Sequence, residues 1–180
     1  YGGTTEFFMD LGFGNVTEVL NGRTIVLDKH TRVTYLSNNL DTIIIIESEG
    51  KVLVNINDAL PSASPQIIEL FLSKISKRWP KIDFVFSSYG GASYFPNTVH
   101  YEKKDDVEIA ETREQFFVRN FCRIAQGLNP VFAVPFASDF VLLDEQQRWI
   151  NRAKFPREKI AEYFRQFTGG QGSTKIIEAY

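Results

Sequence analysis

Residues 41–58 have the pattern of one β-hairpin, and this hairpin constrains the fold more than any other part of the chain. Four consecutive isoleucines occupy its first half, and a run that alternates with valine occupies its second half. β-Branched residues favour strands, and the dipeptide Glu49-Gly50 between the two runs suits a two-residue hairpin turn. We therefore expect strands at residues 42–47 and 51–56, joined by a tight turn.

The register of this hairpin predicts a pair of facing carboxylates. If Ser48 pairs with Lys51 beside the turn, Asp41 lies opposite Asp58 at the open end of the hairpin. Directly opposed residues of neighbouring strands have Cβ atoms about 4.5–5.5 Å apart. Two negative charges so close repel each other unless a proton, a cation or water separates them, and a shared divalent metal is one solution. Alternatively, the strand ends separate and both carboxylates are solvated turn residues.

The rest of the chain changes from strands to alternating helices and strands. Asn21-Gly22 predicts a hairpin turn between the first two of the further strands. Those strands are expected at residues 16–20, 24–27, 33–36, 82–86, 131–134 and 174–177. Helices are expected from residue 65 to before Pro80, at 111–126 and at 157–167, with a short helix and loop over 140–153. This order predicts an α/β layered domain with mixed sheets and outer helices.

Composition limits the domain count and the class of partner. The chain has 180 residues, of which 43% are hydrophobic, and it shows no repeat or linker, so we treat 1–180 as a single domain. Its net charge of −2 gives no reason to expect nucleic acid or an anionic membrane as a partner. No apolar run reaches the ~20 residues that span a bilayer. The single cysteine, Cys122, excludes an internal disulfide and agrees with a reducing, cytoplasmic setting.

A glycine-containing loop is the second candidate site. It follows the predicted buried strand at 82–86, where α/β proteins often bind ligands. Gly90, Gly91 and Ser93 could contact a substrate there, although a glycine pair is also common in simple turns. Asn57 beside Asp58 could add a polar rim, or cap the turn before the first helix. The motifs HExxH, G-x-S-x-G and the P-loop lysine are all missing from the sequence.

Four motifs in order resemble a known family. They are Asp41-Thr42 before the isoleucine strand, Asp58 after the next strand, and the segments 90–96 (GGASYFP) and 135–140 (PFASDF). Together they resemble the metallo-β-lactamase-fold portion of CMP-N-acetylneuraminate hydroxylase and its bacterial relatives. The resemblance implies the second part of a four-layer αββα sandwich. Because the chain opens at Tyr1 without methionine, we expect it to be a piece of something longer.

The resemblance also assigns roles to individual residues. Asp58 takes the position of the superfamily aspartate that bridges two metals. Asp41 falls where many members carry a histidine ligand, and Phe136 falls where many carry the last ligand. A phenylalanine cannot bind metal, whereas a carboxylate suits zinc or iron. The His-x-His-x-Asp-His motif that supplies most ligands in this superfamily does not occur in the sequence, so it would have to precede Tyr1.

Two functions follow as alternatives. In the first, the chain is part of a metal-dependent enzyme that acts on a small-molecule substrate, as a hydrolase or as the metal domain of an oxygenase system. Zinc or iron would be bound by Asp58 and Asp41, with further ligands from the remainder of the polypeptide, and an oxygenase would need an electron-donor partner. In the second, the chain is a metal-free binding or scaffold domain. Both alternatives are compatible with a module that completes its fold only against another chain or segment. Such a module is expected to have exposed apolar surface.

Overall fold

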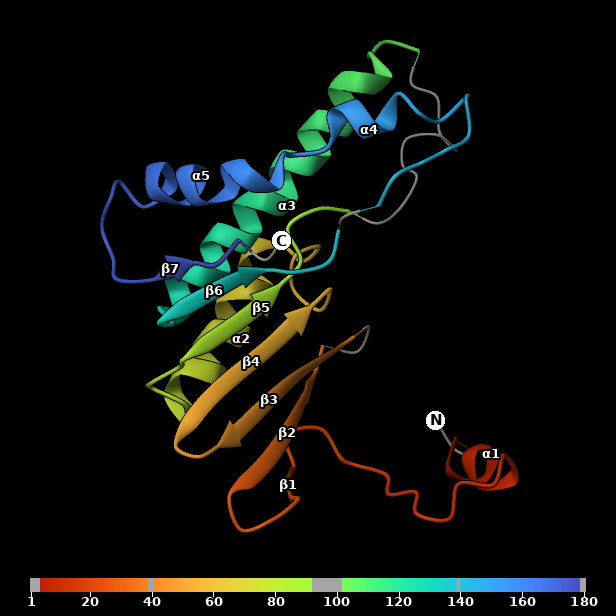
Figure 1. Ribbon diagram of the computed structural model, residues 1–180, viewed down its shortest axis with the longest axis vertical. Coiled ribbons are helices and arrows are strands. Elements are labelled where there is room, and N and C mark those ends of the chain that lie inside the picture. The colour runs from red at the N-terminus through yellow and green to blue at the C-terminus, as the bar shows by residue number, and fades with distance from the viewer. Residues whose placement is uncertain (1–3, 39–40, 92–101, 139, 179–180) are drawn as a thin grey trace.

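A seven-stranded sheet with helices forms the body of the computed structural model (Figure 1). The structure describes residues 4–38, 41–91, 102–138 and 140–178. The strands lie in chain order and are β1 (Thr24–Val26), β2 (Thr31–Ser37), β3 (Thr42–Ser48), β4 (Lys51–Asn57), β5 (Phe84–Ser87), β6 (Phe132–Pro135) and β7 (Lys175–Ile176). The helices are α1 (Thr4–Asp10), α2 (Pro65–Arg78), α3 (Asp106–Leu128), α4 (Ile150–Ala153), the 3-10 helix η1 (Arg157–Lys159) and α5 (Ile160–Phe167). The α/β class and the mixed sheet expected from the sequence are confirmed.

The direction of strand pairing changes at β4. Strands β1 to β4 are antiparallel to their neighbours, whereas β4 to β7 are parallel to theirs. Helix α2 connects β4 to β5, α3 connects β5 to β6, and α4, η1 and α5 lie between β6 and β7. Such crossovers are right-handed, and all of these step across the sheet in the same direction, so their helices lie on one face. Figure 1 shows α2 and α3 behind the strands.

Two groups of buried side chains hold the helices against that face. The first joins α2 and the end of α3 to β3, β4 and β5, and includes Val54 and Ile75, which have no exposed surface. The second joins α3 to α5 and β6, and includes Phe121, Ala133 and Ile160, which are also fully buried. Because α3 contributes to both groups, it connects the two halves of the molecule.

Capping residues set the limits of α3, the longest helix. The side chain of Asp105 accepts hydrogen bonds from the backbone N–H groups of Val107 and Glu108, at 2.8 and 3.2 Å. At the other end, Asn129 adopts the left-handed conformation, with φ of 44°, which commonly ends helices. The helix begins before the predicted range 111–126, because the cap at Asp105 starts it at Asp106. None of the helices in the described residues is long and apolar enough to cross a membrane.

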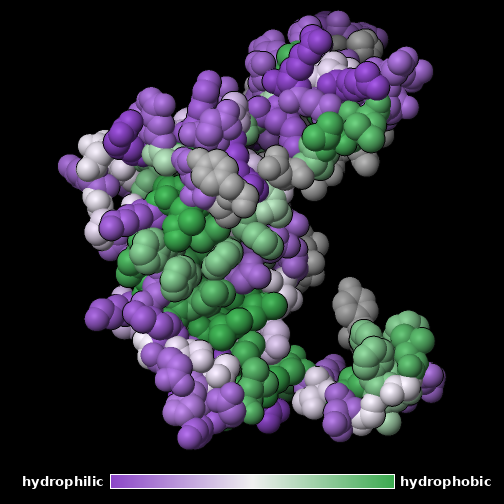
Figure 2. All heavy atoms as spheres, viewed as in Figure 1, coloured by the Kyte–Doolittle hydropathy of each residue, from purple (hydrophilic) through white to green (hydrophobic). Residues whose placement is uncertain are grey.

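The opposite face of the sheet carries a partly exposed apolar surface, which we call the open face. Val85 and Ala133 are buried on the helix side, so their neighbours Phe84, Phe86 and Phe132 point the other way. The open face is formed by Ile44, Ile46, Leu53, Phe84, Phe86 and Phe132. Figure 2 shows apolar side chains gathered over the strands on this face. Within the described ranges, the buried groups that involve helices lie on the other side of the sheet.

The N-terminal region differs from the prediction. Helix α1 was not expected, and it has no buried residues. Residues 16–20 form no strand in the structure; they are largely exposed, and β-propensity acts only where a neighbouring strand is present to pack against. Asn21-Gly22 is consequently not a hairpin turn. Instead, the side chain of Asn21 accepts a hydrogen bond from the N–H of Ser37 at 3.0 Å and donates one to its carbonyl at 3.4 Å.

Candidate functional site

The predicted register of the hairpin is confirmed over its paired length. The pairing of β3 and β4 runs from Ser48↔Lys51 at the turn to Ile44↔Asn55. Beyond Asn55, an irregularity interrupts the pairing of β4 with β5, and Asn57 adopts a left-handed backbone with φ of 43°. This turn redirects the chain just before the second aspartate. The two carboxylates therefore lie past the end of the ladder, where register no longer places them opposite each other.

Asp41 and Asp58 are both exposed, and each forms a local hydrogen bond. Oδ1 of Asp41 accepts a hydrogen bond from the N–H of Thr42 at 2.7 Å, and Oδ2 of Asp58 accepts one from Asn57 Nδ2 at 3.4 Å. Asn38 connects the two ends, because its side chain accepts the N–H of Asp41 and donates to the carbonyl of Ala59. Across the described residues, no three His, Cys, Asp or Glu side chains are grouped so that they could hold a metal.

The carboxyl ends of the parallel strands bring the sequence candidates to one edge of the sheet. The N–H of Ser88 donates to the carbonyl of Asn57 at 3.0 Å, and the N–H of Phe136 donates to the carbonyl of Ser87 at 2.9 Å. These bonds join the loops that follow β4, β5 and β6. Ligands of open α/β sheets commonly bind at such an edge. Asn57, Asp58 and the loop that leads to Gly90 and Gly91 thus lie together, while Ser93 lies outside the described residues.

The glycine pair is buried and is held by the chain's own side chains. Gly90 donates its N–H to Ser138 Oγ at 3.0 Å, and that hydroxyl donates to the Gly90 carbonyl at 2.7 Å. Gly91 donates its N–H to Glu114 Oε1 at 3.2 Å. A Cβ at Gly90 would lie 2.7 Å from Glu114 Oε2, and one at Gly91 would lie 2.5 Å from the guanidinium of Arg113. A side chain at either position would therefore have to displace the end of a side chain from α3.

Glu114 is the main residue that sequence analysis did not identify. It lies on α3 four residues after Ala110 and four before Val118, so it interrupts the buried stripe of that helix. Burial raises the pKa of its carboxyl group above the ordinary value, and the hydrogen bond from Gly91 and the charge of Arg113 oppose that shift. A charged residue within an apolar stripe is the sequence signal that would have found it. Buried carboxyl groups with a perturbed pKa are candidates for functional sites.

Glu114 borders a hollow of about 400 Å³ near the same edge of the sheet. The hollow is lined by Tyr89, Glu114, Ser138, Phe140, Val141, Asn151, Lys154, Phe155, Pro156, Arg157 and Glu158. Ala137 and Ser138 both have positive φ, at 57° and 73°, although neither is glycine. Consecutive residues of this kind store backbone strain and cluster at functional sites. The helix side of the carboxyl edge therefore holds a second candidate site, apart from the two aspartates.

The raised pKa of Glu114 makes a prediction about stability. Its carboxyl group releases its proton more readily in the unfolded chain than in the folded one, so the free energy of unfolding should fall as pH rises from the ordinary pKa through the folded value. Glu114→Gln should remove this fall, because its amide oxygen can still accept the Gly91 N–H. Urea unfolding between about pH 4 and about pH 8 measures the effect. Glu111→Gln, an exposed change on the same helix, should leave the wild-type slope in place.

Comparisons with known proteins do not assign the chain to a family. No family model matches the chain, and no curated protein matches it significantly. The case for a function is therefore made from the arrangement of the residues themselves.

Proposed function

We propose that the chain is the second half of a metallo-β-lactamase-type αββα sandwich, and that it forms part of a metal-dependent enzyme. The open face carries this proposal. A sheet covered by helices on one face and apolar on the other would form half of a four-layer arrangement if a second sheet packed on it, at the usual face-to-face distance of about 10 Å. The covering sheet would come from the remainder of the polypeptide. Exposed apolar patches of this kind mark surfaces that bury against another element.

Asp58 and Asp41 are the residues that would contribute to a metal site. Both carboxylates are exposed at the carboxyl edge, where segments above the open face could reach them. Carboxylate oxygen suits zinc or iron, but two carboxylates are fewer ligands than such ions take, so the remaining ligands would come from outside the 180 residues. A bound metal would polarise a substrate oxygen and lower the pKa of bound water. Asn57, Gly90, Gly91 and Ser93 would shape the substrate pocket.

The reaction class has two versions. A hydrolase would need only the metal and a small-molecule substrate. An oxygenase would also need an electron-donor partner, such as a Rieske centre, whose Cys and His ligands this sequence does not supply. Either version fits a reducing, cytoplasmic setting, because a single cysteine forms no internal disulfide.

A metal-free scaffold is the second candidate function. Phe136, which takes the position of a usual ligand, is 42% exposed at the edge and packs against Phe86 with ring centroids 6.0 Å apart. An aromatic contact at that position favours a surface that binds a partner through packing. In this version Asp41 and Asp58 are solvated turn residues.

Metal analysis of the longest natural polypeptide separates the two functions. We expect zinc or iron at about one ion or more per chain in the wild type, and loss of most of it in Asp58→Asn. Asp41→Asn should lower the metal content less. Asp10→Asn, an exposed change in α1, should retain the wild-type amount. A folded wild-type protein that contains no metal after purification without chelators, and takes up none when zinc or iron is added, would favour the scaffold.

A further inference from the structure

The hollow beside Glu114 has walls that suit a flat organic molecule. Tyr89 and Phe155 come from two different parts of the chain, and both border the hollow together with Phe140. Tyr89 is only 3% exposed, and Phe155 packs edge-on against Tyr163 with ring centroids 5.4 Å apart. Rings held in this way form fixed apolar walls, and small-molecule sites are commonly lined by aromatic side chains in volumes of about 300–1,000 Å³. The hollow falls within that range at about 400 Å³.

Two cations border the same space. The ammonium of Lys154 lies 3.9 Å from the centroid of the Phe140 ring and donates to the Phe140 carbonyl. The guanidinium of Arg157 lies 5.8 Å from the centroid of the Tyr89 ring. Each cation therefore lies beside an aromatic ring that lines the hollow. This cation–π contact holds the positive charge at the rim of the hollow.

Two acidic residues also border this space. Glu114 is buried, and burial raises the pKa of its carboxyl group above the ordinary value. Lys154 and Arg113 are the cations that act on Glu114, and Gly91 supplies its N–H. The exposed Glu158 is the other acidic residue that borders the hollow.

We propose that this hollow is a binding site for a small aromatic carboxylate or phosphate, whose anionic group lies between Lys154 and Arg157 and whose ring packs among Tyr89, Phe140 and Phe155. The site is formed by the loop after β5, by α3 and by the segment between β6 and α5, so it needs neither a metal nor the open face. The existence of this binding site therefore does not depend on the proposed metal site.

Calorimetric titration with three probes tests the site. Benzoate and phenyl phosphate carry the two forms of the anion on the same ring, and benzyl alcohol is their neutral counterpart. We expect benzoate or phenyl phosphate to bind and benzyl alcohol to bind at least about tenfold more weakly, since a charge-assisted hydrogen bond is lost. The stronger of the two anions identifies the natural group as a carboxylate or a phosphate. Equal binding of all three probes, or binding of none, would overturn the proposal.

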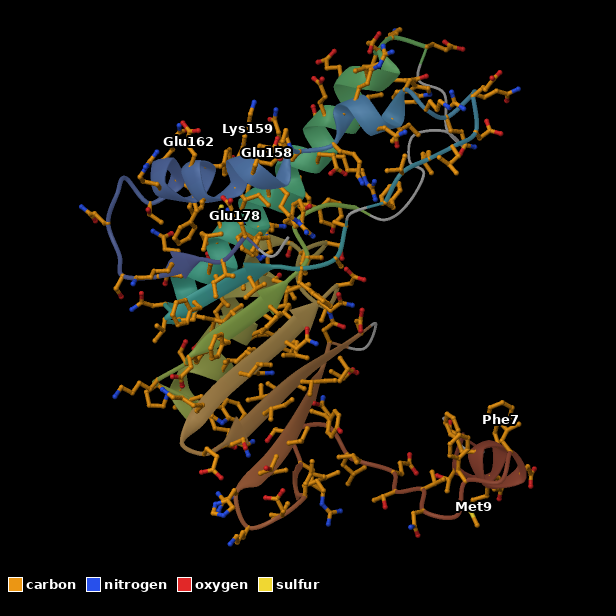
Figure 3. All side chains as sticks on the ribbon, viewed as in Figure 1. Phe7, Met9, Glu158, Lys159, Glu162 and Glu178 are labelled. Carbon is orange, nitrogen blue, oxygen red and sulfur yellow. The ribbon has the colours of Figure 1, made fainter. Side chains whose placement is uncertain are left out.

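Charge substitutions locate the binding on the protein. Arg157→Gln and Lys154→Gln should each weaken the better anion about tenfold, while Glu158→Gln should strengthen it about twofold. Lys159→Gln is the matched control, because Lys159 is exposed beside the same residues without bordering the hollow. Figure 3 shows Lys159 on the outer side of this segment, away from the sheet. If Lys159→Gln weakens binding as much as Arg157→Gln, the anion is attracted by net charge alone and the site is rejected. Thermal unfolding of each variant confirms that it is folded.

Discussion

Gly90→Ala is expected to lower the free energy of unfolding by about 1–3 kcal/mol, the usual cost of overpacking a close-packed site. The added methyl would lie 2.7 Å from Glu114 Oε2 and 3.2 Å from Ser138 Cβ. Neither neighbour can move freely, because Glu114 is hydrogen-bonded to Gly91 and Ser138 is bonded twice to Gly90. The clash therefore displaces one loop of the carboxyl edge or the side chain from α3. Urea unfolding of the purified variant measures the change.

The same substitution at Gly14 provides the control. A Cβ at Gly14 meets nothing within 4 Å, and its backbone does not need the left-handed region. Gly14→Ala should therefore leave stability unchanged or raise it by a few tenths of a kcal/mol, about the gain expected from a less flexible unfolded chain. A comparable loss in both variants would mean that alanine is harmful for a reason other than contact with Glu114.

A double-mutant cycle identifies Glu114 as the cause. Glu114→Ala alone should cost about 1–3 kcal/mol, because it leaves the Gly91 N–H buried without its acceptor. It also removes the atom that the new methyl at Gly90 would strike. The double variant should thus lose less stability than the sum of the two single variants, by at least about 0.5 kcal/mol. Additive losses would place the clash on Ser138 instead.

The hairpin shows how far register predicts a site. Strand residues and the Glu49-Gly50 turn carried enough information to predict every pair from Ser48↔Lys51 to Ile44↔Asn55. The opposed position of the aspartates was extrapolated past the last observed pair, Ile44↔Asn55, and Asn57 turns the chain there with a left-handed backbone. Asparagine is among the residues that tolerate this conformation, but whether it adopts it depends on the neighbouring parallel strand. Tertiary contacts of that kind cannot be derived from a local pattern.

Helices were predicted by their apolar period, and the buried site was missed for the same reason. The period correctly indicated α2, α3 and α5. Cys122 of α3 lies in the interior, where burial raises the pKa of its thiol to about 12. Glu114 was overlooked because a charged residue on an amphipathic helix is ordinarily assigned to the solvent face. Its burial depends on a loop from β5 that brings Gly91 to it across a long stretch of sequence. The glycine pair was therefore identified, whereas the reason for it was not.

Local sequence patterns also could not predict that helices cover only one face of the sheet. Strands β5 and β6 are nearly continuous apolar runs, a pattern that predicts burial on both faces. The strand order β4-β5-β6-β7 has no reversal, so every crossover helix lies on the same face and the other stays open. The apolar residues of the open face are thus consistent with the predicted pattern, provided that a second layer covers them. This agreement is the strongest link between the sequence and the proposed sandwich.

Phe121→Ala is expected to have the largest effect of any single change considered, a loss of about 3–5 kcal/mol in the free energy of unfolding. Phe121 is fully buried and belongs to the group of side chains that joins α3 to α5 and β6. Removing its ring leaves a cavity that fixed elements on three sides cannot close. Phe116→Ala, on the same helix, should cost much less because that ring is 40% exposed. Tyr89, which lines the hollow beside Glu114, belongs to the same buried group as Phe121. If the variant still folds, the anion should therefore bind it more weakly than it binds Phe116→Ala, although neither substitution touches the hollow. Similar stability losses for the two phenylalanines would contradict the burial of Phe121 in the group that joins α3 to α5 and β6.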